Sequence, residues 1–258
     1  MNTFKTIRQL INRYDYGGAL DLLKDRDLEE SDVATVVNSC RYAVNFDFKT
    51  ARYLLSNLPD ERISTSEIQM IIKNLDQLID GNPDAMFSEL MENIKFQIVN
   101  EEFIDFLGRV YRFKEAVLKY LFVKNHIGRS RFSLLTNHME KREILKTLRK
   151  KYRIYNSNLM YGITTYIHRY LKNEYKYTEI EKILNSDHMK ALIELRNDSI
   201  VGHGFKGVSI DDIYRFYGNP YNVLDDFDKC LKKLDVKLFR YKYSVINEYI
   251  EVMLDDLK

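Results

Sequence analysis

The stretch "RNDSIVGHG", residues 196–204, gathers side chains that could do chemistry at one place in the chain. His203 supplies an imidazole, the side chain that most often takes or gives a proton in enzyme sites. Arg196 offers a phosphate a fixed fork of donors and stays charged as negative charge grows. Asn197 could orient a ring nitrogen or a phosphate oxygen. These residue types suit metal-free cleavage of RNA, in which the ribose 2′-hydroxyl attacks the neighbouring phosphate, the arginine stabilises the transition state and the histidine assists proton transfer.

The spacing of this stretch predicts how the side chains meet. The apolar periodicity of "HMKALIELRNDSIVGHG" predicts a helix over 188–201, and seven residues of helix make about two turns. Arg196 and His203 would then share one face, roughly 10 Å apart along the axis, with Ser199 between them as a supporting residue. Gly202 and Gly204 predict that the helix ends here and leaves the imidazole accessible. The alternative is purely structural, because a glycine-flanked histidine is often a helix cap.

The composition bounds the class of protein. The chain has 258 residues, of which 45% are hydrophobic and 30% charged, as in a globular protein. The net charge of +2 means that any nucleic-acid-binding surface must be local. Two distant cysteines predict free thiols and, with no signal peptide or apolar run of about 18 residues, a cytoplasmic location. No metal-ligand spacing or phosphate-binding loop occurs around the remaining histidines and glycines, so neither a metal nor a cofactor is expected.

Periodicity and the small number of breakers, 10 Gly and 3 Pro, predict an all-α protein. The segment "VKLFRYKYSVI" (236–246) is the best strand candidate, but it continues into helical spacing. The expected helices are 3–13, 17–25, 31–44, 48–57, 65–79, 84–124 (broken), 131–151, 155–174, 178–185, 188–201, 209–217, 221–235 and 240–257.

Two domains are expected, with a boundary in "DGNPD" at residues 80–84, where Pro83 can begin a helix. Residues 1–82 form the first domain and residues 83–258 the second. Within the first, "DYGGALDLL" (15–23) and "DFKTARYLL" (47–55) lie 32 residues apart and share Asp, an aromatic, Ala and a Leu pair. This period predicts a layer of stacked, tetratricopeptide-like helical hairpins. The apolar span 84–124 would suit the core of the second domain or a dimer interface.

The segment "KREILKTLRKKYR" (141–153) contains seven basic residues. They could form a path for RNA phosphates, with Tyr152 and Tyr155 as stacking platforms. The alternative is an ordinary solvated helix face. The candidate RNA-binding residues are Arg142, Lys146, Arg149, Lys150 and Arg153.

The sequence "LRNDSIVGHG" (195–204) resembles the signature of the HEPN superfamily, whose ribonucleases carry an arginine, four to six residues and a histidine. Its form is most similar to the accessory ribonucleases of type III-A CRISPR systems, the Csm-six family. "RVYRFKEAVLKYLF" (109–122) resembles the aromatic-rich helix that precedes the motif there, and "YDYGGALDLLK" (14–24) resembles the linker helices. The resemblance implies a C-terminal HEPN bundle in which Arg196, Asn197 and His203 are catalytic.

The resemblance further implies a homodimer in which two motifs share one composite site. The expected function is metal-independent cleavage of single-stranded RNA to 2′,3′-cyclic phosphate and 5′-hydroxyl ends, in CRISPR-linked antiviral defence. The Rossmann-like sensor of that family has no counterpart in the pattern, so activation by cyclic oligoadenylate is not expected. The alternatives are a HEPN toxin or abortive-infection ribonuclease controlled by a partner, and a non-catalytic adaptor that dimerises or binds RNA.

Overall fold

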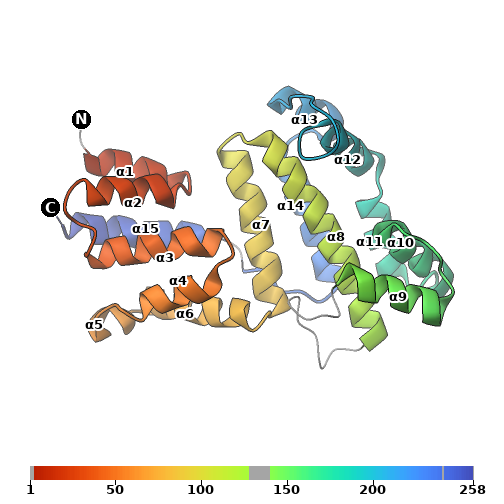
Figure 1. Ribbon diagram of the computed structural model, residues 1–258, viewed down its shortest axis with the longest axis horizontal. Helices are drawn as coiled ribbons and strands as arrows, with labels where there is room; N and C mark the ends of the chain where they lie inside the picture. The colour runs from red at the N-terminus through yellow and green to blue at the C-terminus, as the bar shows by residue number, and fades with distance from the viewer. Residues whose placement is uncertain (1–2, 128–139, 240, 258) are drawn as a thin grey trace. The chain divides into compact units, whose positions relative to one another are not determined.

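The computed structural model describes residues 3–127, 140–239 and 241–257, and these residues form fifteen helices and no strand (Figure 1). The all-α prediction is therefore confirmed. The chain divides into two compact units: unit 1 takes in Met1–Ala85 and Phe239–Lys258, and unit 2 spans Met86–Leu238.

Unit 1 begins with two successive helical hairpins, and they carry the predicted 32-residue repeat. Asp15 and Asp47, at equivalent positions, each cap the helix that follows by accepting the N–H of Gly18 or Thr50. The aromatic residue before each cap turns the chain in the left-handed conformation, with φ of 63° and 65°. The helices are α1 (Thr3–Asn12), α2 (Tyr16–Lys24), α3 (Asp32–Val44), α4 (Phe48–Leu55), α5 (Asp60–Ile63) and α6 (Ser66–Ile79).

The small and apolar residues shared by the two copies fill the seam between these helices. Ala19 and Ala51 are fully buried, as are Leu23 and Leu55. A buried alanine lets neighbouring helices approach closely, and Ser39 uses that closeness to donate to the carbonyl oxygen of Ala51 at 2.9 Å. The repeat was therefore a reliable signal for the hairpin layer.

The last helix, α15 (Lys242–Asp255), belongs to unit 1 and contacts α1, α3 and α6 (Figure 1). Asn247 fixes it there, since its Nδ2 donates to the carbonyl oxygen of Ile11 at 2.9 Å and its Oδ1 accepts from Tyr16 Oη at 2.7 Å. The expected division into 1–82 and 83–258 is thus corrected. The boundary after Ala85 lies close to prediction, but the C-terminal helix returns to the N-terminal layer.

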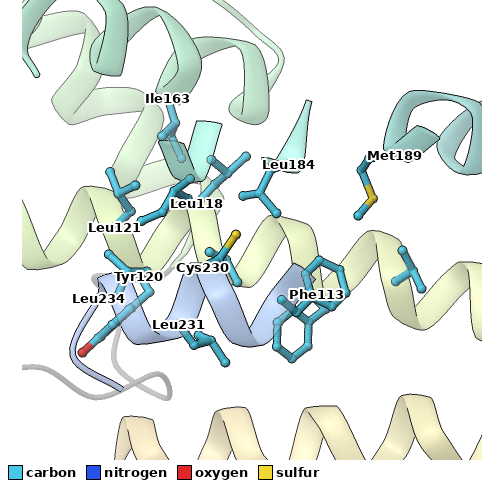
Figure 2. Close-up of a cluster of buried hydrophobic side chains, with 14 of the residues drawn as sticks. Phe113, Leu118, Tyr120, Leu121, Ile163, Leu184, Met189, Cys230, Leu231 and Leu234 are labelled. Atoms are coloured by element: carbon cyan, nitrogen blue, oxygen red, sulfur yellow. The ribbon is translucent and has the colours of Figure 1, made fainter. Parts of the chain in front are cut away.

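Unit 2 is a bundle around one apolar core. Its helices are α7 (Pro83–Val99), which begins at the boundary, α8 (Phe103–Ile127), α9 (Lys141–Tyr152), α10 (Leu159–Tyr170), α11 (Tyr175–Leu184), α12 (Asp187–Asp198), α13 (Ile210–Tyr217) and α14 (Tyr221–Lys233). Helix α8 is central, with contacts to α10, α12 and α14. Side chains from five helices meet there, among them Phe113, Ile163, Leu184, Met189 and Cys230 (Figure 2).

The expected helix 84–124 is two helices, because the chain turns at Glu101, which has a φ of 59°. Its apolar residues are buried inside unit 2, where the ring of Phe87 packs at a tilt against that of Phe113, with 5.6 Å between ring centroids. The span therefore forms core and does not present the apolar dimer surface that its composition suggested. The strand candidate also differs: the described residues of 236–246 contain no strand, and α15 begins within them. Residues 131–139 of another expected helix lie outside the described residues.

None of the described helices has the length and apolar character needed to cross a membrane.

Candidate functional site: the loop at the end of α12

The candidate site is built on α12 and the loop that follows it. Ser186 caps the start of the helix by accepting the N–H of Met189 at 3.3 Å. Met189, Leu192 and Leu195 are buried against the bundle core, which fixes the rotation of α12 and the direction of Arg196 beside them. The sequence thus positions the arginine with an ordinary amphipathic helix.

Helix α12 ends at Asp198, three residues earlier than predicted. Ser199 ends it: its side chain is buried, and both its N–H and its Oγ donate to the carbonyl oxygen of Arg196, the Oγ at 2.8 Å. A serine that bonds back to its own helix competes with the next helical hydrogen bond. Ser199 is therefore a structural residue of the turn. Because the helix ends before His203, Arg196 and His203 do not share a helix face, contrary to the prediction.

The chain turns back sharply and returns His203 to the helix end. The N–H of His203 donates to the carbonyl oxygen of Asn197 at 2.9 Å, and the N–H of Lys206 donates to that of Asp198 at 2.9 Å. The N–H groups of Gly202 and Gly204 both donate to the carbonyl oxygen of Ser199, at 2.9 and 3.3 Å. These bonds satisfy carbonyl groups that a helix C-terminus otherwise leaves unpaired, and they fix the loop backbone.

The two glycines are required by the close approach of this turn. A Cβ added to Gly202 would lie 2.4 Å from the carbonyl oxygen of Arg196. A Cβ added to Gly204 would lie 2.0 Å from the carbonyl oxygen of Asp198. Both contacts are with backbone, which cannot move aside cheaply. The glycines therefore do more than stop the helix: they allow the loop to fold onto it.

Arg196 is half-buried against Tyr111 of α8, with its guanidinium carbon 4.7 Å from the ring centroid. Its Nη1 donates to the side-chain oxygen of Asn197 at 3.2 Å. Its Nε is buried and has no hydrogen-bond partner among the described residues, which also form no ion pair with it. A held guanidinium with unused donors and no carboxylate counter-ion can accept an anion such as phosphate.

His203 and Asn197 are both exposed, so a substrate can reach them. Two large apolar side chains of the same loop are exposed as well: Ile200 is 67% and Phe205 94% accessible. Phe205 is held by a backbone that is hydrogen-bonded on either side of it, at Gly204 and Lys206. An aromatic ring so exposed, on a fixed loop beside a titratable group, is a candidate contact for another molecule.

The loop is also supported from the two neighbouring helices. Val201 lies against Gly108 of α8, where an added Cβ would be 3.9 Å from its side chain. Beyond the loop, Ser209 and Asp212 form a capping box that starts α13, and these hydrogen bonds lower the pKa of Asp212. His188 at the start of α12 contacts the carbonyl oxygen of Phe216 at the end of α13 at 2.8 Å, so the two helices hold the loop between them.

The second set of candidate residues lies on α9. Arg142, Lys146, Arg149 and Lys150 are exposed and line one hollow of about 530 Å³ with Lys141 and Leu145. Arg153 does not line it and instead forms the left-handed C-cap of the helix, with a φ of 53°. No residue of the 196–204 loop lines this hollow, so the two candidate sites occupy different places on unit 2.

The two tyrosines expected as stacking platforms differ. Tyr152 is enclosed in an aromatic cluster, with Tyr166 and Tyr170 at 4.7 and 5.0 Å between ring centroids. It is half-buried there and supports the bundle, and its stacking role stays a prediction. Tyr155 is 70% exposed and Tyr161, at the start of α10, is 69% exposed. Tyr161 was not singled out by sequence, nor was Tyr111, although Tyr111 lies in the aromatic segment 109–122 that precedes the motif.

The described residues contain no group of three or more His, Cys, Asp or Glu side chains that could hold a metal ion. Cys40 and Cys230 are buried and are not joined in a disulfide, and burial raises the pKa of Cys230 to about 12. Neither thiol has the accessibility of a nucleophile, and the raised pKa of Cys230 is the opposite of what a nucleophilic thiol needs.

Comparison with known proteins identified no relative of the chain. No family model matches the chain, and neither a curated protein nor a solved structure is similar to it.

Proposed function

We propose that the chain is a metal-independent endoribonuclease of the HEPN type that cleaves single-stranded RNA at the α12 loop. The observation that carries the proposal is the state of Arg196. This cationic side chain is held on Tyr111, its buried Nε has no partner among the residues that the structure describes, and it is close in the chain to an exposed histidine on a fixed turn. The resemblance of "LRNDSIVGHG" to the HEPN signature supports it from the sequence side.

In the proposed reaction the guanidinium of Arg196 binds the scissile phosphate and stabilises the negative charge that grows on its oxygens. Asn197, already bonded to Arg196 Nη1, orients the guanidinium. His203 transfers a proton, either from the 2′-hydroxyl or to the leaving 5′-oxygen. The products are a 2′,3′-cyclic phosphate and a 5′-hydroxyl.

In an in-line displacement the attacking 2′-oxygen and the leaving 5′-oxygen lie on opposite sides of phosphorus. We therefore propose that two histidines divide the proton transfers, and that the active form is a homodimer with two loops facing one another. The exposed Ile200 and Phe205 support this, since a second copy seated on them would remove both side chains from water. Burying a phenylalanine is worth about 1.5–3 kcal/mol. The resemblance suggests a role in antiviral defence for such an enzyme.

The test is incubation of the purified chain with single-stranded RNA in EDTA, followed by analysis of the product ends. Products with a 2′,3′-cyclic phosphate, and resistance of a strand with 2′-deoxyribose at the scissile position, are expected. Strict dependence on a divalent metal, or efficient cutting of DNA, would contradict the proposed chemistry. If the dimer cleaves no RNA, the result would favour the alternative of a non-catalytic adaptor that dimerises or binds RNA.

A further inference from the structure

One helix carries a larger net positive charge than the whole chain. Helix α9 carries six basic residues and one acidic residue, a formal charge of +5, whereas the whole chain carries +2. The rest of the chain is therefore acidic by three charges. Among the described residues only Lys146 of this helix forms an ion pair, with Glu143 at 3.1 Å. The other five, Lys141, Arg142, Arg149, Lys150 and Lys151, have no carboxylate partner in the described part of the chain. Such cations repel one another, and a polyanion would relieve that repulsion.

The cations also share one face of the helix. Lys141, Arg142, Lys146, Arg149 and Lys150 line the 530 Å³ hollow, while Ile144 and Leu148 on the other side of α9 are buried in the core. The burial fixes the rotation of α9, so the cationic face is held outward. This face, defined by the five lining cations, is called the α9 basic face below.

An exposed tyrosine precedes, in the chain, the residue at which α10 packs on α9. Leu145, which lines the hollow, lies 4.0 Å from the position of a Cβ added to Gly162, and Leu148 lies 3.1 Å from it. The absent side chain of Gly162 lets α10 pack directly on α9. Tyr161, the residue before it, is 69% exposed. Tyr155, 70% exposed, follows the C-terminus of α9.

We propose that the α9 basic face binds the phosphates of a single-stranded RNA and that Tyr161 stacks on one of its bases. The site is separate from the α12 loop. Sequence-independent single-strand binding combines a cationic groove with aromatic platforms, and both are present here. A duplex keeps its bases stacked internally and offers nothing to the ring of Tyr161.

An anionic membrane is the other polyanionic surface to consider, and the geometry of α9 disfavours it. A helix that binds at a membrane interface turns its apolar face to the lipid. The apolar face of α9 is occupied by the core, and the exposed rings near it are tyrosines. The lining of the hollow therefore offers charge to a membrane but only one apolar residue, Leu145, which is partly buried.

The test is fluorescence anisotropy of a labelled single-stranded 2′-O-methyl RNA, titrated with the wild-type chain at 50–300 mM salt. This strand cannot be cut by internal attack, so binding is measured whether or not the proposed cleavage occurs. The variant carries Arg142→Gln, Lys146→Gln and Arg149→Gln. The matched control carries Lys182→Gln, Lys229→Gln and Lys232→Gln, which remove the same charge from exposed positions on α11 and α14.

Loss of three phosphate contacts lowers the slope of log K against log salt by about 2, which is roughly a 50-fold loss of affinity at 0.15 M salt. The control should keep the wild-type slope. Tyr161→Leu should weaken binding about fivefold or more with no change of slope. Equal losses in variant and control, or unchanged binding by the variant, would overturn the proposal. The proposal would also be overturned if the chain bound phosphatidylserine vesicles through the same three residues and had no affinity for the RNA.

Discussion

The backbone N–H of His203 donates to the carbonyl oxygen of Asn197 at 2.9 Å, six residues earlier in the chain. This bond closes a tight turn in which the histidine comes back to the end of the helix that carries Arg196. The distance between the two candidate catalytic residues is thus set by a folded loop. The function of the site depends on whatever keeps that loop closed.

Gly204→Ala should open the loop. Its Cβ would lie 2.0 Å from the carbonyl oxygen of Asp198, so the hydrogen bonds from Gly204 and Lys206 must lengthen or break. We expect a loss of about 1–3 kcal/mol in the free energy of unfolding and loss of most RNA cleavage. Urea denaturation and a cleavage assay measure the two effects.

Gly207→Ala is the matched control, because nothing lies within 4 Å of a Cβ added there. It should leave both stability and cleavage close to wild type. Equal behaviour of the two alanine variants would show that the close approach at Gly204 has no consequence.

Tyr111→Leu should lower cleavage while Tyr111→Phe should keep it. The phenylalanine ring still faces the guanidinium of Arg196, whereas leucine has no π-system to hold it. A cation–π contact of about 0.5–2 kcal/mol corresponds to a roughly two- to thirty-fold change in kcat/KM. Steady-state kinetics on one RNA measures the effect, and equal activity of the two variants would remove Tyr111 from the site.

Phe205→Asp should weaken dimer formation without weakening the fold, since this side chain is 94% exposed within the chain. We expect sedimentation to show a higher dimer dissociation constant and the cleavage rate to fall with the dimer population. Tyr53→Asp, which replaces a 66% exposed ring in unit 1, is the control. A monomer with full specific activity would mean that one chain holds a complete site.

Lys114→Met should stabilise the protein near neutral pH. Burial, with a smaller contribution from nearby Lys190 and against the opposite effect of Glu181, lowers the pKa of Lys114 to about 8. The unfolded chain therefore binds more protons between about pH 8 and 10.5, so the stability contribution of this residue rises with pH across that window. The buried charge of Lys114 lowers the free energy of unfolding most below pH 8.

The gain from Lys114→Met is up to about 3 kcal/mol at pH 7, and it should shrink between pH 8 and 10.5. Chemical denaturation at several pH values measures it against Lys119→Met, whose lysine is paired with Glu115 at 2.8 Å. A gain that stays constant or grows toward pH 10.5 would contradict the lowered pKa.

Local sequence signals predicted much of the fold because they act over a few residues. The repeat of Asp15 and Asp47 predicted two hairpins, and both residues cap helices. The partner of α15 could not be predicted, because periodicity indicates which face of a helix is buried and not what buries it. The bonds of Asn247 to Ile11 and Tyr16 span more than two hundred residues.

Residue types in the sequence indicated the candidate site, but the predicted arrangement of Arg196 and His203 on one helix face was wrong. A heptad spacing places Arg196 and His203 on one face only if the helix continues, and the buried bond of Ser199 Oγ to Arg196 ends it. The apolar periodicity of a sequence does not indicate where a side chain will bond to the backbone. The role of Tyr111 also depends on tertiary packing of α8 against α12, and sequence offered only an aromatic-rich segment.

The most direct test of the central claim is a single-turnover cleavage assay in EDTA with wild-type chain, His203→Ala and Arg196→Ala, all purified in the same way. His203 is exposed and Arg196 makes no ion pair among the described residues, so both variants should melt close to wild type. We predict cleavage by the wild type to a 2′,3′-cyclic phosphate and loss of at least a hundredfold in rate for each variant, of the order that one proton-transfer or charge-stabilising group supplies. Cleavage by folded His203→Ala at the wild-type rate would contradict the assignment of the active site to this loop.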